Sequence, residues 1–296
     1  MIHLSTSSAG VNAVVTWILA LLKFWGKFRR NRAAMLGLCL ITLLAIGAIC
    51  APIIAPYNPI APHYADRLSP PNGLYLFGTD ELGRDLFSRL LYGGRISLVI
   101  GFAVQGVATA IGTTLGLIAG WYGGWRDDLI MRLAEIVFAV PNLVFLIVWV
   151  TLLQPTPISI FLGLGLISWP GSARMMRAQV LVIKQQDYIM AARSLGGAVP
   201  HILWHHVLPN AITPILVLFW LGIGSTILTE SALSFLGLGI TIPTPSWGVM
   251  IDVGRSYMTT AWWYAVFPGL TILLTVLGFN FIGEGLREAL NPASGH

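Results

Sequence analysis

The stretch "DYIMAARSLGGAVPHILWHHVLPN", residues 187–210, is a polar interval between two long apolar runs of the chain. Ala191 and Ala192 give its first part a helical surface from which almost nothing projects, so another protein can lie close against it. Gly196 then permits a sharp turn or a positive backbone angle, and Pro200 suits the first position of a second helix. The stretch therefore predicts two short helices joined by a turn, lying outside a bilayer.

The composition of the chain indicates a membrane protein. The 296 residues are 56% hydrophobic and only 10% charged, with a mean hydropathy of +0.78, whereas soluble domains are about 25% charged. The net charge of +5 comes from too few side chains to predict a nucleic-acid partner. Cys39 and Cys50 lie in one apolar run, about 16 Å apart on a helix, so neither a disulfide nor a metal site is predicted from them.

The apolar runs predict an all-α protein with six transmembrane helices and with both termini in the cytoplasm. Basic residues, including Arg174 and Arg177 in the return after the fourth span, fall mainly on the cytoplasmic side. In chain order we expect a cytoplasmic segment 1–32, a first transmembrane helix 33–56, an extracytoplasmic loop 57–95, a membrane core 96–286 and a cytoplasmic tail 287–296. The core spans are placed at 96–125, at two short runs within 136–173 folded about 154–157, at 207–229 and at 260–283.

Residues 1–32 end in a mixture of basic and aromatic side chains that is typical of an interfacial amphipathic helix. A cleaved signal peptide is the alternative. The apolar stretch 11–22 precedes the basic cluster instead of following it, which favours the uncleaved helix.

Gly112, Gly116 and Gly120 are spaced four residues apart within the second predicted span. Small residues at this spacing let two helices approach closely, so this face predicts a helix–helix contact. Gln105, Asn142 and Asn280 also lie within spans, where amides more often tie helices together than bind a solute. In the outer loop, the mixture of acidic and basic residues, Arg84 and Asp85 among them, suits a small folded loop with a helix cap.

The opening stretch resembles the cytoplasmic signature of ABC-importer permeases. That signature reads Glu-Ala-Ala, three further residues, Gly and, after nine more, Ile-x-Leu-Pro. Met190 stands at the Glu position and His206 at the Ile position, while Asp187, one turn earlier, offers a carboxylate on the same face. The resemblance implies a coupling helix within a loop at 183–209 that docks in a groove of a nucleotide-binding subunit. Its expected residues are Asp187, Met190, Ala191, Ala192, Arg193, Gly196, Leu208 and Pro209.

Three further segments, 77–101, 234–250 and 279–292, resemble the dipeptide/oligopeptide/nickel branch of these permeases, and within it the C-type subunit. The resemblance implies a heterodimer with a homologous permease in the bacterial inner membrane, with two cytoplasmic ATPases and an extracytoplasmic solute-binding protein. It implies peptide cargo, dipeptides first, with oligopeptides or nickel as alternatives. ATP and magnesium belong to the ATPases, because the Gly26-Lys27 pair of this chain is followed by Phe28 and forms no P-loop. No catalytic residue, bound cofactor or metal is expected in this chain.

Two other classes of protein are weighed against this interpretation. An intramembrane enzyme would need a constellation such as paired Asp or Ser-Lys at membrane depth, and the spans carry only Glu230 and isolated amides. A channel or an ion-coupled carrier would not need the large cytoplasmic loop. Glu230 itself either lines the substrate pathway near its outer end or caps the fifth span, and both alternatives stay open. The histidines at 201, 205 and 206 lack a neighbouring Cys or carboxylate and favour an interfacial position over a metal site.

Overall fold

The computed structural model describes residues 22–240 and 243–290, and within them the chain is helical, with one isolated β-bridge between Thr79 and Asp85. The α-helices are α2 (Arg32–Ile49), α3 (Ala51–Ile54), α4 (Leu86–Tyr122), α5 (Gly124–Ala139), α6 (Asn142–Leu153), α7 (Pro157–Ile183), α8 (Asp187–Ser194), α9 (Val199–Ile202), α10 (Leu208–Leu233), α11 (Trp247–Gly254) and α12 (Trp263–Leu290). Short 3-10 segments (Tyr64–Asp66, Arg255–Tyr257) and π segments (Leu203–Val207, Ser234–Leu238) complete the described structure.

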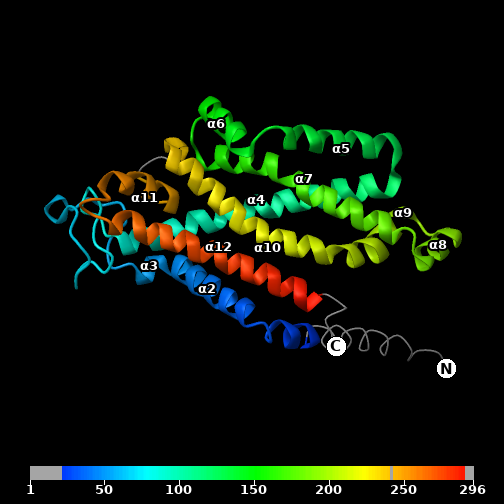
Figure 1. Ribbon diagram of the computed structural model, residues 1–296, viewed down its shortest axis with the longest axis horizontal. Coiled ribbons are helices and arrows are strands. Elements are labelled where there is room, and N and C mark those ends of the chain that lie inside the picture. The colour runs from blue at the N-terminus through cyan, green and yellow to red at the C-terminus, as the bar shows by residue number, and fades with distance from the viewer. Residues whose placement is uncertain (1–21, 241–242, 291–296) are drawn as a thin grey trace, which may run out of the picture.

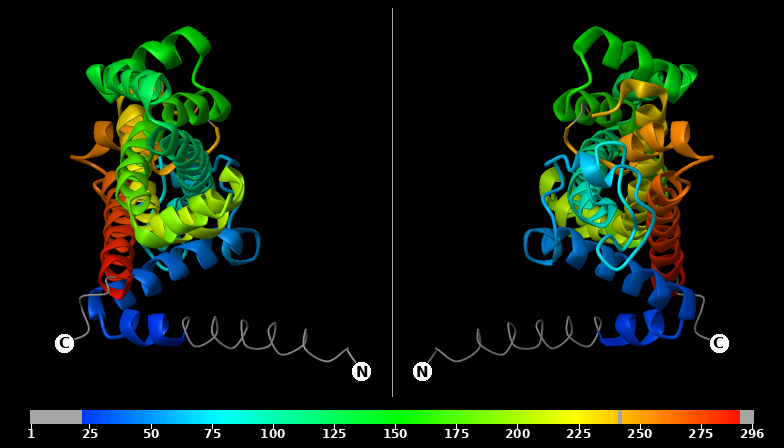
Figure 2. Two further views of the ribbon diagram at one scale, coloured as in Figure 1. Left: turned by 90° about the vertical axis from the view of Figure 1, so that its right-hand side faces the viewer. Right: turned by 90° about the vertical axis from the view of Figure 1, so that its left-hand side faces the viewer.

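The long helices α2, α4, α7, α10 and α12 run along one axis as a bundle (Figure 1). Helices α8 and α9 lie at one end of it, and α11 lies at the other end with the segment that precedes α4. The start of α2 and the end of α12 point toward the end that carries α8. Helices α5 and α6 form one edge of the bundle, opposite residues 22–31, in both end views (Figure 2).

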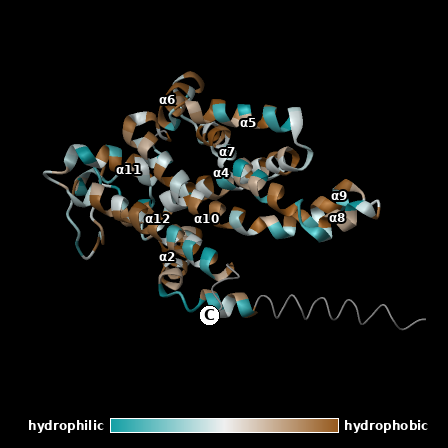
Figure 3. Ribbon diagram, turned by 45° about the vertical axis from the view of Figure 1, so that its right-hand side comes forward, coloured by the Kyte–Doolittle hydropathy of each residue, from teal (hydrophilic) through white to brown (hydrophobic). Residues whose placement is uncertain are grey.

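The expectation of an all-α membrane protein is confirmed. Among the residues that the structure describes, four helical stretches are long and apolar enough to cross a bilayer, and the number rises to 5 if the bent pair α5 and α6 is counted as one span. The four are Arg32–Ile49, Leu86–Tyr122, Val199–Leu238 and Trp263–Leu290. In Figure 3, most residues of α6 are hydrophobic, whereas hydrophobic and hydrophilic residues alternate along α5. Six spans therefore remain a prediction.

The region expected to hold two short spans at 136–173 is arranged differently. Helices α5 and α6 meet at Pro141 and are bent by 85°, because proline disfavours a helical conformation of the residue before it. The chain does turn at Gln154, but α7 then continues to Ile183 and includes the two arginines assigned to the cytoplasmic return. Arg177 fits there because Nε and Nη2 of its guanidinium donate to the two carboxylate oxygens of Asp127 in α5, at 2.5 and 2.6 Å.

Helix α4 begins at Leu86, so the predicted loop 57–95 ends ten residues too late. Asp85 starts the helix by accepting the backbone N–H of Ser88 at 2.8 Å. With 37 residues, α4 is about 55 Å long and exceeds a hydrocarbon core of about 30 Å. Its glycine stripe is confirmed as a helix contact, because a Cβ at Gly116 would lie 2.4 Å from the carbonyl oxygen of Ala173 in α7.

The segment before α4 is a folded loop held by ion pairs, as its mixed charges predict. Arg84 and Arg89 are both 2% exposed. Arg84 bonds to Asp80 at 2.6 Å, and Arg89 donates to the carbonyl oxygen of Pro59 at 2.8 Å. The hydroxyl of Tyr264 in α12 donates to Glu81 of the loop at 2.5 Å. The loop thus joins the start of α4 to the start of α12.

Candidate functional site

The opening stretch of the sequence forms the expected pair of short helices, with α8 followed by a tight turn and α9. Gly196 adopts φ +77° and ends α8. Its N–H donates to the carbonyl of Arg193, and the N–H of Gly197 donates to that of Ala192, both at 3.0 Å. This pair of bonds is the Schellman motif, which favours glycine because the left-handed conformation penalises residues that have a Cβ.

Three helices of the bundle, α4, α7 and α10, contact the α8–α9 element and the residues beside it. Ile189 of α8 and Ile202 of α9 are 0% and 1% exposed, in a cluster shared with α7 and α10. The guanidinium of Arg193 lies 4.0 Å from the ring centroid of Trp121, in the last turn of α4. Lys184, just before α8, donates to the carbonyl oxygen of Gly120 at 2.8 Å. These contacts tie α8 and its flanking residues to α4, α7 and α10.

The element and the residues that follow it carry several large apolar side chains that are exposed. Met190 is 48% exposed, Leu195 88% and Trp204 66%. Asp187 and Ala191 are exposed beside Met190, whereas Ala192 is half-buried. Large apolar side chains on a polar border are typical of a protein-docking surface, and the carboxylate of Asp187 lies at the N-terminal end of α8.

Leu208 and Pro209 do not form a separate entrance to the fifth span, because the chain is already helical from Val199 onward. The residues just before Pro209 form a π-helical turn, in which the N–H of Leu208 donates to the carbonyl oxygen of Leu203. Leu208 is half-buried and Pro209 is exposed. The second helix of the element and the fifth span thus form one continuous rod.

Glu230 lies inside the bundle and does not open to solvent within this chain. It is 1% exposed, and the hydroxyl of Ser234 donates to its carboxylate at 2.9 Å. The helix continues past Glu230 into the π segment Ser234–Leu238, so Glu230 does not lie at the end of the helix.

A polar pocket that the sequence did not predict lies between α4, α7 and α10, and Phe138 of α5 and Asn142 of α6 also line it. Its volume is about 220 Å³, and its lining combines amide and hydroxyl side chains with small residues and a few apolar ones. The polar members are Gln105, Asn142, Ser168, Ser172, Ser225 and Thr226. Two of them, Gln105 and Asn142, stood out in the sequence only as ties between helices. Serine and threonine are too common in spans to signal a pocket.

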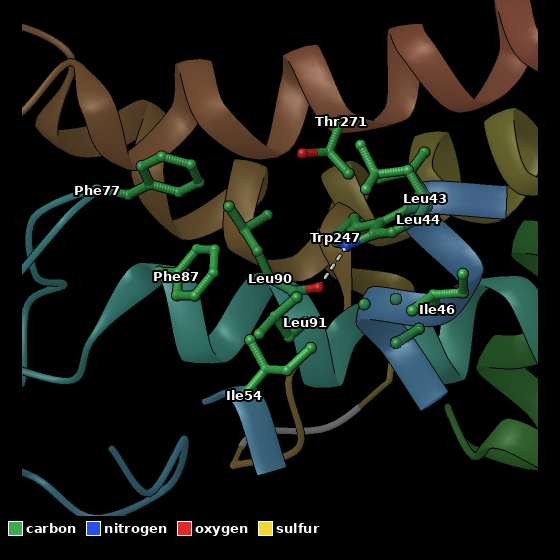
Figure 4. A pocket seen from close by; sticks show the side chains of 13 residues that line it. Leu43, Leu44, Ile46, Ile54, Phe77, Phe87, Leu90, Leu91, Trp247 and Thr271 are labelled. Atoms are coloured by element: carbon green, nitrogen blue, oxygen red, sulfur yellow. Dashed lines mark hydrogen bonds between the residues drawn. The ribbon is translucent and has the colours of Figure 1, made fainter. Parts of the chain in front are cut away.

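A larger pocket of about 420 Å³ lies between α2, α4, α11 and α12 and is lined almost wholly by apolar side chains (Figure 4). Its polar atoms already have partners. The indole N–H of Trp247 donates to the carbonyl of Leu90 at 3.0 Å, and the hydroxyl of Thr271 donates to that of Phe267 at 2.9 Å. Both donors are therefore already used, and this pocket offers a solute mainly apolar contacts, unlike the polar pocket.

The three histidines of the opening stretch lie together without a metal-binding arrangement. The rings of His201 and His205 stack with their centroids 4.1 Å apart. No group of three or more His, Cys, Asp or Glu side chains suited to a metal ion occurs in the described part of the chain.

Comparison with known proteins assigns the family. Residues 112–295 match the family described as binding-protein-dependent transport system inner membrane component, and residues 21–71 match the N-terminal transmembrane domain of oligopeptide transport permease C. The chain is 41% identical to the dipeptide transport system permease protein DppC of Haemophilus influenzae over 91% of this chain and 94% of the relative. It is 45% identical to the glutathione transport system permease protein GsiD of Escherichia coli, over 91% and 89% of the two chains.

A chain of the MetNI methionine ABC transporter, solved in inward-facing conformations, shares the fold. Its TM-score is 0.56 at 17% identity, over 69% of this chain and 97% of that chain. The long apolar helices and the exposed α8–α9 element are consistent with the class of membrane transport protein that the two family matches indicate. The chain therefore belongs to the binding-protein-dependent inner membrane components of bacterial ABC transport systems, as a C-type permease of the peptide family.

Proposed function

We propose that this chain forms one half of the membrane pathway of an importer for short peptides. The names of its relatives point to cargo of this size, since one group is described by dipeptides and the other by glutathione, a tripeptide. Dipeptides are the first candidate, with oligopeptides and nickel as the alternatives. A homologous permease supplies the other half of the pathway, and a solute-binding protein delivers the peptide from outside.

The observation that carries the proposal is the α8–α9 element. It presents exposed apolar residues beyond the end of the bundle, and buried contacts tie it to α4 and α10. Partner ATPases that hold ATP and magnesium would dock on this surface, and their closure would move both helices. Coupling between distant sites requires such an element with different contacts in two states.

In this proposal the membrane is crossed six times, with the α8 end in the cytoplasm. Helices α5 and α6 together make one crossing, and α7, which has 27 residues, makes the crossing back. The start of α2 and the end of α12 point toward the α8 end (Figure 1), which supports cytoplasmic termini. Glu230 remains a candidate for the pathway only if the second permease or a conformational change exposes it.

The test is uptake of a labelled dipeptide by cells with and without the chain, competed with unlabelled dipeptide, glutathione, a pentapeptide and nickel ions. The proposal expects uptake to require the chain and short peptides to compete best. Competition by nickel alone would contradict the proposal. Peptide uptake that is the same with and without the chain would also contradict it. Failure of the chain to co-purify with an ATPase would instead favour a channel or an ion-coupled carrier.

A further inference from the structure

We infer that the polar pocket between α4, α7 and α10 is a subsite for the main chain of the transported peptide, with Gln105 as its principal contact. The inference rests on the proposed function and assigns part of the pathway to named residues. The pocket volume of about 220 Å³ is below the range of about 300–1,000 Å³ that encloses whole drug-sized ligands. It therefore suits a short piece of extended chain, with the remaining contacts supplied by the second permease.

The polar side chains of the pocket keep hydrogen-bonding capacity that the protein does not use. Gln105 is 6% exposed, Ser172 3% and Thr226 5%. The amide nitrogen of Gln105 donates weakly to Thr109 at 3.3 Å, which leaves its carbonyl oxygen as an acceptor. Within the described residues neither Ser172 nor Thr226 has a side-chain hydrogen-bond partner. Such groups are costly at membrane depth unless a ligand or water satisfies them.

The chemistry of the lining matches the part that all peptides share. No charged side chain lines the pocket, and the charged residues Glu135, Arg174 and Arg177 line a separate one. Peptides differ in the charge of their side chains, but every peptide bond offers one N–H and one carbonyl. Neutral amide and hydroxyl groups can bind that bond without favouring acidic, basic or neutral peptides.

A glycine in α10 makes room for the Gln105 amide. A Cβ at Gly222 would lie 2.3 Å from the amide carbon of Gln105 and 2.4 and 2.6 Å from its nitrogen and oxygen. Any side chain at this position would therefore displace the amide. The amide of Gln105 in α4 thus packs directly against the backbone of α10 at the wall of the pocket.

The experiment replaces Gln105 by methionine, which keeps the length and removes the hydrogen bonds, in the complete transporter. Initial uptake rates are measured for the dipeptides Ala-Ala, Ala-Glu and Ala-Lys, each relative to the wild-type chain. We expect Gln105→Met to lower all three rates by a similar factor of about 2 to 10, the loss of one hydrogen bond. ATP hydrolysis stimulated by the loaded binding protein should persist, which shows that the complex is assembled.

Gln179→Met is the matched control, because it makes the same substitution in α7 at a residue that does not line the pocket. Unchanged uptake in Gln105→Met, an effect confined to one charge class, or an equal effect of Gln179→Met would overturn the inference. Gly222→Ala displaces the amide without altering it and should reproduce the loss, so it decides the matter if Gln105→Met does not assemble. Wild-type uptake that does not require the chain would refute the proposed function instead.

Discussion

A substitution of Gly196, in the turn after α8, should cost free energy through the backbone conformation alone. Gly196 has φ +77°, and a Cβ added there would meet nothing within 4 Å. An alanine therefore fits sterically but is held in the left-handed region, at a cost of about 1–2 kcal/mol. That cost lowers the population of the capped turn by a factor of roughly 5–30. We expect Gly196→Ala to loosen α8 without unfolding the bundle.

The assay is peptide imported per ATP hydrolysed, in proteoliposomes that contain the complete transporter and its binding protein. Gly196→Ala should lower this ratio several-fold, because ATPase closure then moves α8 without moving α4 and α10 to the same extent. Gly196→Asn is the control, since Asn enters the left-handed region more readily. Aspartate shares this tolerance, so Gly196→Asp should uncouple less than Gly196→Ala. A normal ratio in Gly196→Ala, or equal losses in the alanine and asparagine variants, would refute the reasoning.

Three further predictions concern the bundle. Gly116→Ile should separate α4 from α7 and cost about 1–3 kcal/mol of stability through overpacking. This cost should appear as a lower melting temperature in detergent. Gly106→Ile should not lower the melting temperature, because a Cβ there would meet nothing within 4 Å. Arg89→Met removes the charged hydrogen bond to the carbonyl oxygen of Pro59 and should destabilise the protein by about 1.5–3 kcal/mol. Arg95→Met, at an exposed position, should melt like the wild type. Trp121→Leu removes the ring that contacts Arg193 of α8. It should lower the ratio of peptide transported to ATP hydrolysed more than Trp121→Phe, which keeps an aromatic ring. Equal ratios in the two variants would contradict a role of this contact in linking α8 to α4.

Local signals in the sequence predicted the parts of the fold that local rules decide. The glycines at 112, 116 and 120 indicated a helix contact, and the structure places them against α7. The glycine and proline pattern at 187–210 predicted the α8–α9 element, because a Schellman turn depends on neighbouring residues only. The family resemblance added the docking role that local rules do not supply.

Features that depend on packing between distant residues could not be predicted from the sequence. The arginines of α7 were assigned to a loop because their charges were counted without the partner Asp127, which is 50 residues away. The start of α4 was placed too late because Arg89 and Arg95 interrupt the apolar run, although Arg89 is buried within the helix. The polar pocket is assembled from single residues on separate helices, and no linear pattern brings Gln105 close to Gly222.

Helix α4 has the proportions of a lever. Its 37 residues contain no proline, and they connect Trp121 at the α8 end with the ion-paired loop at the other. With one end fixed, a tilt of about 5° moves the far end of a rod of about 55 Å by about 5 Å. That distance is close to the spacing of about 4.8 Å between neighbouring extended chains. In the proposed pathway, a small rotation imposed at α8 would therefore change the width of the passage by about that of one peptide chain.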